Sequence, residues 1–309
     1  MKRFKNITKQ LVTLCLVMAM AITMLPQAAQ ARTIRKKMTL YVGGDYTYSS
    51  QLKASNIKSS NKKIVTAKKG KYDTSIDFVA KKAGKATVTC KLKGNPTTFD
   101  VTVKKPSISI SMAATSKGYV LFSFKNKTKQ TFDKITYKYT LKDKNGKVLK
   151  QNTQGICYLL AKKTTYYTMY ITKDMAANID YKKCTAKVTS ASYEAGETYT
   201  DISSKVDLFA FDQEETESGF KFSVNIDNLS GKTAIGYYYI MVYDKNKKLI
   251  GVMDTYDFYL NAGDSKQYKD IEISKSEYGF YPGAHSYKLV MYAFSTSEKK
   301  GWTEKLTGW

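Results

Sequence analysis

The chain has 309 residues, of which 51 are Lys or Arg and 26 are Asp or Glu, giving a formal net charge of +25. Hydrophobic residues make up 42%, enough for packed cores, while 18 Gly and 4 Pro exclude a collagen-like or proline-rich polymer. A single His excludes any metal site or catalytic triad that needs two histidines, and 25 Tyr with 13 Phe favour strands.

The first 31 residues are typical of an export signal. A basic start containing Lys2, Arg3, Lys5 and Lys9 precedes an apolar run over 11–25, and Ala29-Gln30-Ala31 supplies a small-x-small cleavage site. That run is too short for a membrane-spanning helix, which needs about 20 residues. We therefore expect cleavage after Ala31 and a secreted, cell-surface-associated protein; an uncleaved anchor is the alternative.

Charge and strand pattern divide the rest of the chain into three modules. Residues 32–105 carry 18 basic and 4 acidic residues, 106–200 carry 16 and 6, and 201–309 carry 13 and 16. Long stretches with helical periodicity do not occur outside the signal. We predict an all-β protein of three tandem β-sandwich, immunoglobulin-like modules after a signal peptide.

Short strands separated by turns make up the first module. The expected strands, in chain order, are 38–42, 46–48, 64–67, 77–80, 87–90 and 99–103. Gly43-Gly44-Asp45 and Ser59-Ser60-Asn61 are turn sequences between them. Their spacing is that of a small sandwich.

Three blocks of this module then resemble a known family. They are Leu40-Tyr41-Val42-Gly43, Ser59-Ser60-Asn61 with the residues up to Val65, and Phe78–Thr89 with its Ala83-Gly84-Lys85-Ala86 core. In this order and spacing they are similar to the bacterial immunoglobulin-like domain, group 2, over residues 34–104. The resemblance implies a spacer or adhesion module in a secreted or surface protein, and that family has no catalytic residues to transfer.

The second and third modules form an internal repeat of about 100 residues. Asn126 matches Asn228, Asp143 matches Asp244, Leu160 matches Leu260 and Tyr167 matches Tyr268. Residues 134–142 and 220–227 alternate apolar and polar side chains, which predicts antiparallel sheets with one wet face. The pentads 139–143 and 240–244 look like degenerate copies of the FxLYD-type extracellular domain, a family with no established chemistry to transfer.

Catalytic patterns are weak. His285 lies in a turn-like segment, and the mature cysteines lie in the other two modules, so a Cys–His dyad would have to form across a module boundary. No metal-ligand spacing and no phosphate loop occurs. Asp254 and Asp257 flank Tyr256 and could form the acid pair of a glycan-active enzyme, which we keep as a remote alternative. We expect no enzyme activity, no cofactor and no metal.

Candidate binding residues fall into two groups. Lysine pairs spread through the first module suggest a broad basic patch for an anionic surface: Lys36, Lys37, Lys62, Lys63, Lys68, Lys69, Lys81 and Lys82. The same lysines could instead serve solubility and protect strand edges. Tyr238, Trp302 and Trp309 are candidates for an exposed aromatic platform that would stack on sugar rings.

Cysteine usage excludes a disulfide scaffold. The mature chain would keep Cys90, Cys157 and Cys184, and the pair Cys157–Cys184 within one module is the disulfide candidate. The sequence therefore favours an exported, non-catalytic structural or adhesion protein whose partners are anionic envelope polymers or surface glycans. A host or neighbouring cell-surface protein is a further possible partner, nucleic acid is not expected, and a carbohydrate-binding protein is the main alternative.

Overall fold

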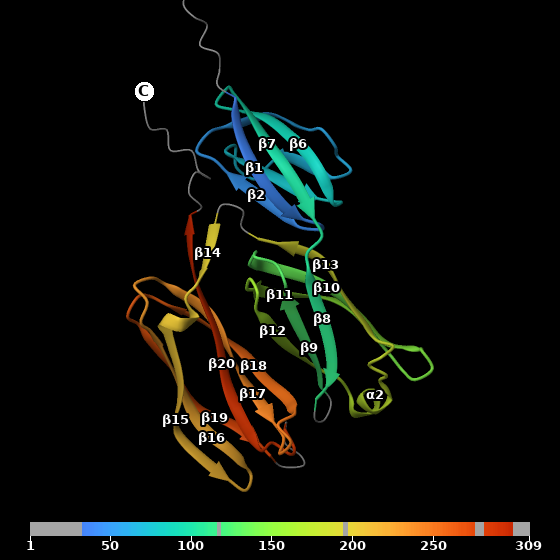
Figure 1. Ribbon diagram of the computed structural model, residues 1–309, viewed down its shortest axis with the longest axis vertical. Helices are drawn as coiled ribbons and strands as arrows, with labels where there is room; N and C mark the ends of the chain where they lie inside the picture. Colours follow the sequence, from blue (N-terminus) through green and yellow to red (C-terminus); the bar gives the residue numbers. More distant parts are fainter. Residues whose placement is uncertain (1–32, 116–118, 194–196, 276–280, 299–309) are drawn as a thin grey trace, which may run out of the picture.

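The computed structural model describes residues 33–115, 119–193, 197–275 and 281–298 (Figure 1). Its regular structure is almost entirely β-sheet, arranged as six sheets of three or four strands, so the all-β prediction is confirmed. We call residues 33–105 the N-terminal segment, 106–193 the middle segment and 197–298 the C-terminal segment. The expected signal, residues 1–31, lies outside the described residues.

Two sheets build the N-terminal segment. The four-stranded sheet has the order β1-β7-β6-β3 and the three-stranded sheet the order β2-β5-β4. The strands are β1 (Ile34–Tyr41), β2 (Asp45–Ser49), β3 (Ala54–Ser59), β4 (Val65–Lys69), β5 (Ser75–Ala80), β6 (Gly84–Leu92) and β7 (Asn95–Lys104). β1 runs parallel to β7, and the other pairs are antiparallel.

The middle and C-terminal segments share one strand plan. The middle segment has sheets β11-β10-β13 and β12-β9-β8, and the C-terminal segment has β14-β20-β17-β18 and β15-β16-β19. The middle strands are β8 (Ile108–Ala114), β9 (Tyr119–Asn126), β10 (Phe132–Lys142), β11 (Val148–Leu159), β12 (Thr164–Tyr170) and β13 (Thr185–Ser192). The C-terminal strands are β14 (Glu197–Asp201), β15 (Val206–Thr216), β16 (Gly219–Asn228), β17 (Ala234–Tyr243), β18 (Leu249–Leu260), β19 (Ser265–Ser274) and β20 (Ser286–Glu298).

β14 is the one strand of the C-terminal segment without a counterpart in the middle segment. It pairs with β20, so it belongs to the C-terminal sheet, and the boundary expected after residue 200 moves to its N-terminal side. A short helix α2 (Lys173–Asn178) interrupts the middle segment where no helix was expected; Thr172 caps it by accepting a hydrogen bond from the Met175 amide. Six residues are too few to give a periodic signal.

Alternation along β10 and β16 fixes the cores. Ile135, Tyr137, Tyr139 and Leu141 all have 0% exposure, as the period-two pattern requires. On β16, Phe222, Val224 and Ile226 are buried as expected. Ser223 and Asn225 on the opposite face are buried as well, which corrects the wet face expected for this strand.

Two buried asparagines show that the repeat found in the sequence is also present in the structure. The Asn126 side-chain amide donates to the carbonyl oxygens of Gln130, Leu159 and Leu160, at 2.8, 3.2 and 3.1 Å. The Asn228 amide donates to those of Lys232, Leu260 and Asn261, at 2.8, 3.1 and 2.7 Å. Leu159 therefore matches Leu260, which corrects the expected match of Leu160 by one residue.

The hairpin turns repeat as well. Asp143 accepts hydrogen bonds from the amides of Asn145 and Lys147, and Asp244 accepts them from Asn246 and Lys248. These short aspartate-capped turns join the two strands of each antiparallel hairpin. Equivalent aspartates thus close the β10–β11 hairpin of the middle segment and the β17–β18 hairpin of the C-terminal segment.

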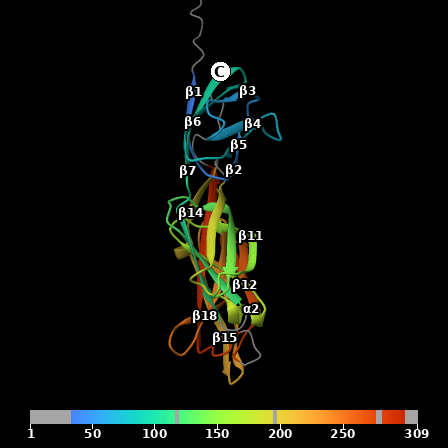
Figure 2. The ribbon, with the colours of Figure 1, turned by 90° about the vertical axis from the view of Figure 1, so that its right-hand side faces the viewer.

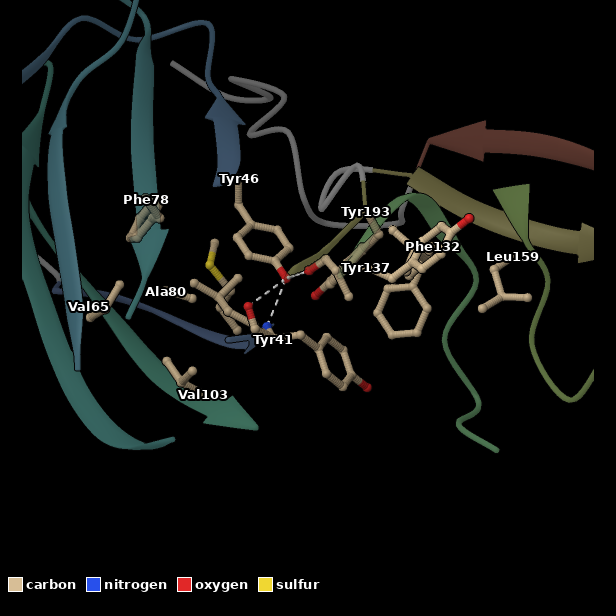
Figure 3. Packing of buried hydrophobic residues seen from close by; sticks show 14 of the residues in the cluster. Tyr41, Tyr46, Val65, Phe78, Ala80, Val103, Phe132, Tyr137, Leu159 and Tyr193 are labelled. Carbon is tan, nitrogen blue, oxygen red and sulfur yellow. Dashed lines mark hydrogen bonds between the residues drawn. The ribbon is translucent and has the colours of Figure 1, made fainter. Parts of the chain in front are cut away.

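One hydrophobic cluster runs through both the N-terminal and the middle segments. Where they meet, the Tyr46 hydroxyl accepts a hydrogen bond from the Tyr41 amide at 2.8 Å and donates to the Ala191 carbonyl at 2.7 Å (Figure 3). Gly44 lies beside the same carbonyl, and a Cβ there would come within 2.4 Å of the Ala191 oxygen. The turn between β1 and β2 therefore has to be glycine for this docking.

The middle and C-terminal segments lie side by side, with the N-terminal segment at one end of the pair (Figures 1 and 2). A separate apolar cluster fills the seam between them, with Leu121 on β9 facing Tyr237, Tyr239 and Met241 on β17. Because Tyr238 and its alternate neighbours face the C-terminal core, β17 is buried on both sides. An ion pair of 3.0 Å between Lys163 and Asp201 crosses the same seam.

The buried asparagines predict a local loss of stability. Replacing Asn228 with Ala leaves the three carbonyl groups that its amide serves without that donor, so we expect the free energy of unfolding to fall by about 2–3 kcal/mol. Chemical denaturation of the mature protein measures this change. Asn261→Ala, at an exposed neighbouring position, is the control and should change stability by less than about 0.5 kcal/mol; equal effects of the two substitutions contradict the structural role of Asn228.

The Lys163–Asp201 ion pair predicts a pH effect. Burial raises the pKa of Asp201, but hydrogen bonds from Ser203 and Lys163 outweigh it and hold the pKa below its usual value. The Asp201 carboxylate therefore adds its full contribution to folding stability above the unfolded-state pKa of about 3.9. This contribution is lost as the pH falls through the lower folded-state pKa. Asp201→Asn should cost about 0.5–1 kcal/mol at pH 7 and nothing in strong acid; a cost independent of pH contradicts the ion pair.

Candidate functional site

The outer face of the four-stranded sheet β1-β7-β6-β3 collects positive charge. Alternation turns every second residue of these strands outward, and six exposed outward residues are cationic: Arg35, Lys37, Lys58, Lys85, Lys91 and Lys104. We call these six residues the basic face. One acidic residue, Asp100 on β7, points outward beside these cations, and its carboxylate lies 3.3 Å from the Arg35 guanidinium.

Threonine hydroxyls separate the cations in rows across the strands. The strand register puts Thr98 and Thr89 between Arg35 and Lys58. A row nearer the middle segment runs from Thr39 through Thr102 to Lys85. Successive outward rows are about 7 Å apart along the strands, because each residue advances about 3.3 Å. Cations alternating with hydroxyl donors are suited to anionic oxygens.

A groove of about 720 Å³ is hollowed into this face beside the middle segment. Lys37, Lys85 and Asp100 line it, together with the hydroxyls of Thr87 and Thr102. Gln130 and Tyr193 of the middle segment close one end, where the Tyr193 hydroxyl donates to the Thr39 carbonyl. Docking of the middle segment therefore closes one end of the groove.

The eight lysines expected to form one patch are not brought together. The Lys81 and Lys82 amides both donate to the Ile64 carbonyl, so these residues lie beside Lys62 and Lys63 at one end of the segment. Lys68 and Lys69 end β4 at its other end, where Lys69 pairs with Asp73.

The remaining pair, Lys36 and Lys37, points to opposite faces of β1. Lys36 turns inward, and its ammonium lies 5.4 Å from the centroid of the Tyr48 ring. Lys37 alone of the eight belongs to the basic face.

Sequence reasoning missed most of the basic face. Counting adjacent lysine pairs selects loops and strand ends, because neighbouring residues on a strand point to opposite sides. The informative signal was the alternation in 84–92, which places Lys85, Thr87, Thr89 and Lys91 on one side.

The structure contradicts the expected role of Tyr238 in an exposed aromatic platform. Its side chain has 0% exposure and packs in the C-terminal core, so it cannot stack on a ligand at the surface. The rings on the opposite side of β17, Tyr237 and Tyr239, are covered by the middle segment. Trp302 and Trp309 lie outside the described residues.

The expected disulfide does not form. Cys157 is exposed, Cys184 is half-buried and Cys90 is buried, and no disulfide joins any two of the three. Cys157 pairs with Lys134 on one side of β10, whereas Thr185 pairs with Thr140 on the other side. The offset of six residues along β10 is about 20 Å, whereas a disulfide needs Cα atoms within about 7 Å.

The residues kept for catalytic alternatives are not assembled into a catalytic site. His285 is exposed, and its amide donates to the Tyr243 carbonyl. Asp257 lies at the seam of the middle and C-terminal segments, and the side chain of Asp254 is outside the described residues. Across the described ranges, no group of three His, Cys, Asp or Glu side chains could hold a metal ion, and no helix is long and apolar enough to span a membrane.

Comparisons with known proteins leave the family open. No family model and no curated protein matches the chain. Red sea bream transglutaminase is 11% identical with a TM-score of 0.19; the match covers 66% of this chain but only 32% of the transglutaminase. The tandem CBM22-1-CBM22-2 domain of Paenibacillus barcinonensis Xyn10C is 11% identical over 88% of this chain and 93% of that one, with a TM-score of 0.13. Likenesses at these scores carry no argument about function.

The cysteine geometry predicts three free thiols in the mature protein. Under non-reducing conditions a small maleimide should label Cys157 fast, Cys184 more slowly and Cys90 only after unfolding, because access follows exposure. Intact-mass and peptide analysis measure the labelling. A peptide pair joined through Cys157 and Cys184 is the result that contradicts this geometry.

Proposed function

We propose that this is an exported, non-catalytic protein of the cell envelope that binds an anionic polymer across its basic face. The observation that carries the proposal is the six-cation face with its threonine rows and groove. A grooved sheet face with outward rows about 7 Å apart suits an extended polyanion better than a compact ligand. The predicted export signal supplies the compartment.

Electrostatics set the expected strength. Each lysine or arginine close to an anionic surface contributes about 1 kcal/mol, and that contribution is screened within about 10 Å at 0.1 M salt. The five lysines of the basic face acting together give useful retention that high salt reverses, while Arg35 is already paired with Asp100. A binding role of this kind needs no buried pocket and no reactive group.

The remaining segments would serve as the support of this face. The two-sheet architecture of the N-terminal segment supports, as part of the proposal, its assignment to the bacterial immunoglobulin-like domain, group 2. That family usually supplies spacer or adhesion modules. The FxLYD-like assignment of the middle and C-terminal segments is proposed on the same terms, as extracellular modules without catalytic chemistry.

Charge reversal on the basic face tests the function. In Lys37→Glu/Lys85→Glu both groove cations become anions, and we expect binding to purified cell walls to fall at least about tenfold at low salt. The matched control is Lys68→Glu/Lys82→Glu, which changes net charge equally at exposed positions off this face. Co-sedimentation of the mature protein with walls, and with walls stripped of anionic polymer, measures binding.

The outcomes separate specific from general attraction. The proposal predicts retention by the control, release of the native protein by about 0.5–1 M salt through screening, and weak binding to stripped walls. Equal losses in both variants, or retention that survives high salt and polymer removal, contradict a polyanion site on this face.

A further inference from the structure

β8 and β13 lie on the side of the middle segment that faces away from the C-terminal segment (Figure 1), and a groove of about 700 Å³ is hollowed between them. Residues 108–110 of β8 and 186–189 of β13 form its walls. Val42, Lys105 and Pro106, at the junction with the N-terminal segment, complete the lining. We call this the β8–β13 groove. It shares no lining residue with the groove on the basic face.

Both walls are edge strands, because within the described sheets β8 pairs only with β9 and β13 only with β10. Backbone groups of alternate residues on β13 point to β10 and to the free side in turn. Lys187 points to β10 through its pair with Lys138, since alternate carbonyls of β10 face β13 and that of Thr136 accepts a hydroxyl from there. The amides and carbonyls of Ala186 and Val188 therefore point to the free side.

The floor of the groove is apolar, because alternate side chains of both strands point between the sheets. Those lining it are half-buried: Ile108 and Ile110 on β8, Ala186 and Val188 on β13. When the hairpin aspartates of the repeat are matched, the strand registers place Ala186 and Val188 at the positions of Leu289 and Met291 on β20. The middle segment thus carries two smaller side chains where its repeat packs larger ones against its own core.

The charged groups of the groove are cationic. Lys105 and Lys187 line it and are both exposed, and among the described residues neither forms an ion pair. Ser109 and Thr189 add exposed hydroxyls, and the described lining contains no acidic side chain. Opposite charge on a ligand is therefore favoured here.

Elsewhere the chain covers edges of this kind itself. β14 pairs antiparallel with the end of β20, the counterpart of β13, and β14 begins with Glu197 and ends with Asp201. At the far end of β13 the Tyr46 hydroxyl donates to the Ala191 carbonyl. Among the described residues, neither cover reaches the stretch of β13 that lines the groove.

We propose that the β8–β13 groove binds an extended acidic peptide, which adds as an antiparallel strand to the free side of β13. The peptide residues opposite Ala186 and Val188 exchange backbone hydrogen bonds with them, and their apolar side chains fill the space between the sheets. The residues between them turn outward like Lys187, where acidic side chains pair with its ammonium group. The site uses no residue of the basic face.

A short peptide of alternating glutamate and valine with blocked ends is the probe. Titration of the mature protein, followed by nuclear magnetic resonance, should show saturable binding, and a copy with lysine in place of glutamate should bind at least about tenfold more weakly. N-methylation of the valine amides removes the donors that face β13 and should cost at least about tenfold. The matched control, N-methylation of the glutamate amides, blocks only the outer side and should leave affinity within about twofold.

Variants of the protein give a second readout. Ala186→Leu/Val188→Met installs the side chains of the repeat, which should fill the groove and weaken peptide binding at least about tenfold while the far-ultraviolet spectrum is kept. Lys187→Glu should weaken binding at least about fivefold. The matched control Lys147→Glu reverses an exposed charge in the β10–β11 hairpin turn and should leave affinity unchanged.

Absence of saturable binding by the acidic peptide would overturn the proposal. Equal binding of the two N-methylated peptides would show that charge alone attracts them and contradict strand addition. Equal effects of Lys187→Glu and Lys147→Glu, or full binding by the filled variant, would place the peptide outside this groove. None of these outcomes depends on retention by cell walls, so this proposal and the proposed function fail separately.

Discussion

Tyrosines placed at the seams between segments hold this molecule together, because each ring buries apolar surface while its hydroxyl serves the backbone of a neighbouring segment. Tyr46 does this for the Ala191 carbonyl, Tyr237 for the Tyr158 carbonyl and Tyr239 for the Tyr166 amide. A sandwich leaves backbone groups exposed at its edge strands, and covering them with apolar side chains alone would leave those groups unsatisfied. Tyrosine meets both needs at these three positions.

The docking of the segments through these tyrosines also shapes the candidate binding site. Because β17 is buried on both faces, the middle and C-terminal segments cannot separate without exposing a second apolar surface. The groove on the basic face is closed at one end by Gln130 and Tyr193 of the middle segment. Burial also raises the pKa of Tyr46, Tyr193 and Tyr237, so these hydroxyls stay protonated and able to donate throughout the physiological range.

The alternation of apolar and polar side chains along the sequence predicts much of the fold but little of the candidate site. The alternation of 134–142 gave both the strand and its buried face, whereas β3 was missed because a bulge with Asn56 at φ 53° breaks its period. The run Tyr237–Tyr239 predicted a ring on each side of a strand but not that a neighbouring segment covers the second side. The row order of the basic face depends on pairing across β1, β7, β6 and β3, and the closed end of its groove depends on docking. Neither is written in one stretch of sequence.

Hydrogen exchange at the Tyr166 amide tests the seam tyrosines most directly, because this amide donates its hydrogen bond to the Tyr239 hydroxyl. The account predicts slow exchange in the native protein, and in Tyr239→Phe a large acceleration there, with little change at Tyr137, deep in the middle core. Tyr238→Phe, which alters the neighbouring ring on the other side of β17, is the matched control and should leave Tyr166 protected. Unchanged protection of Tyr166 in Tyr239→Phe, or equal loss in both variants, would contradict the claim that tyrosine hydroxyls close the segment edges.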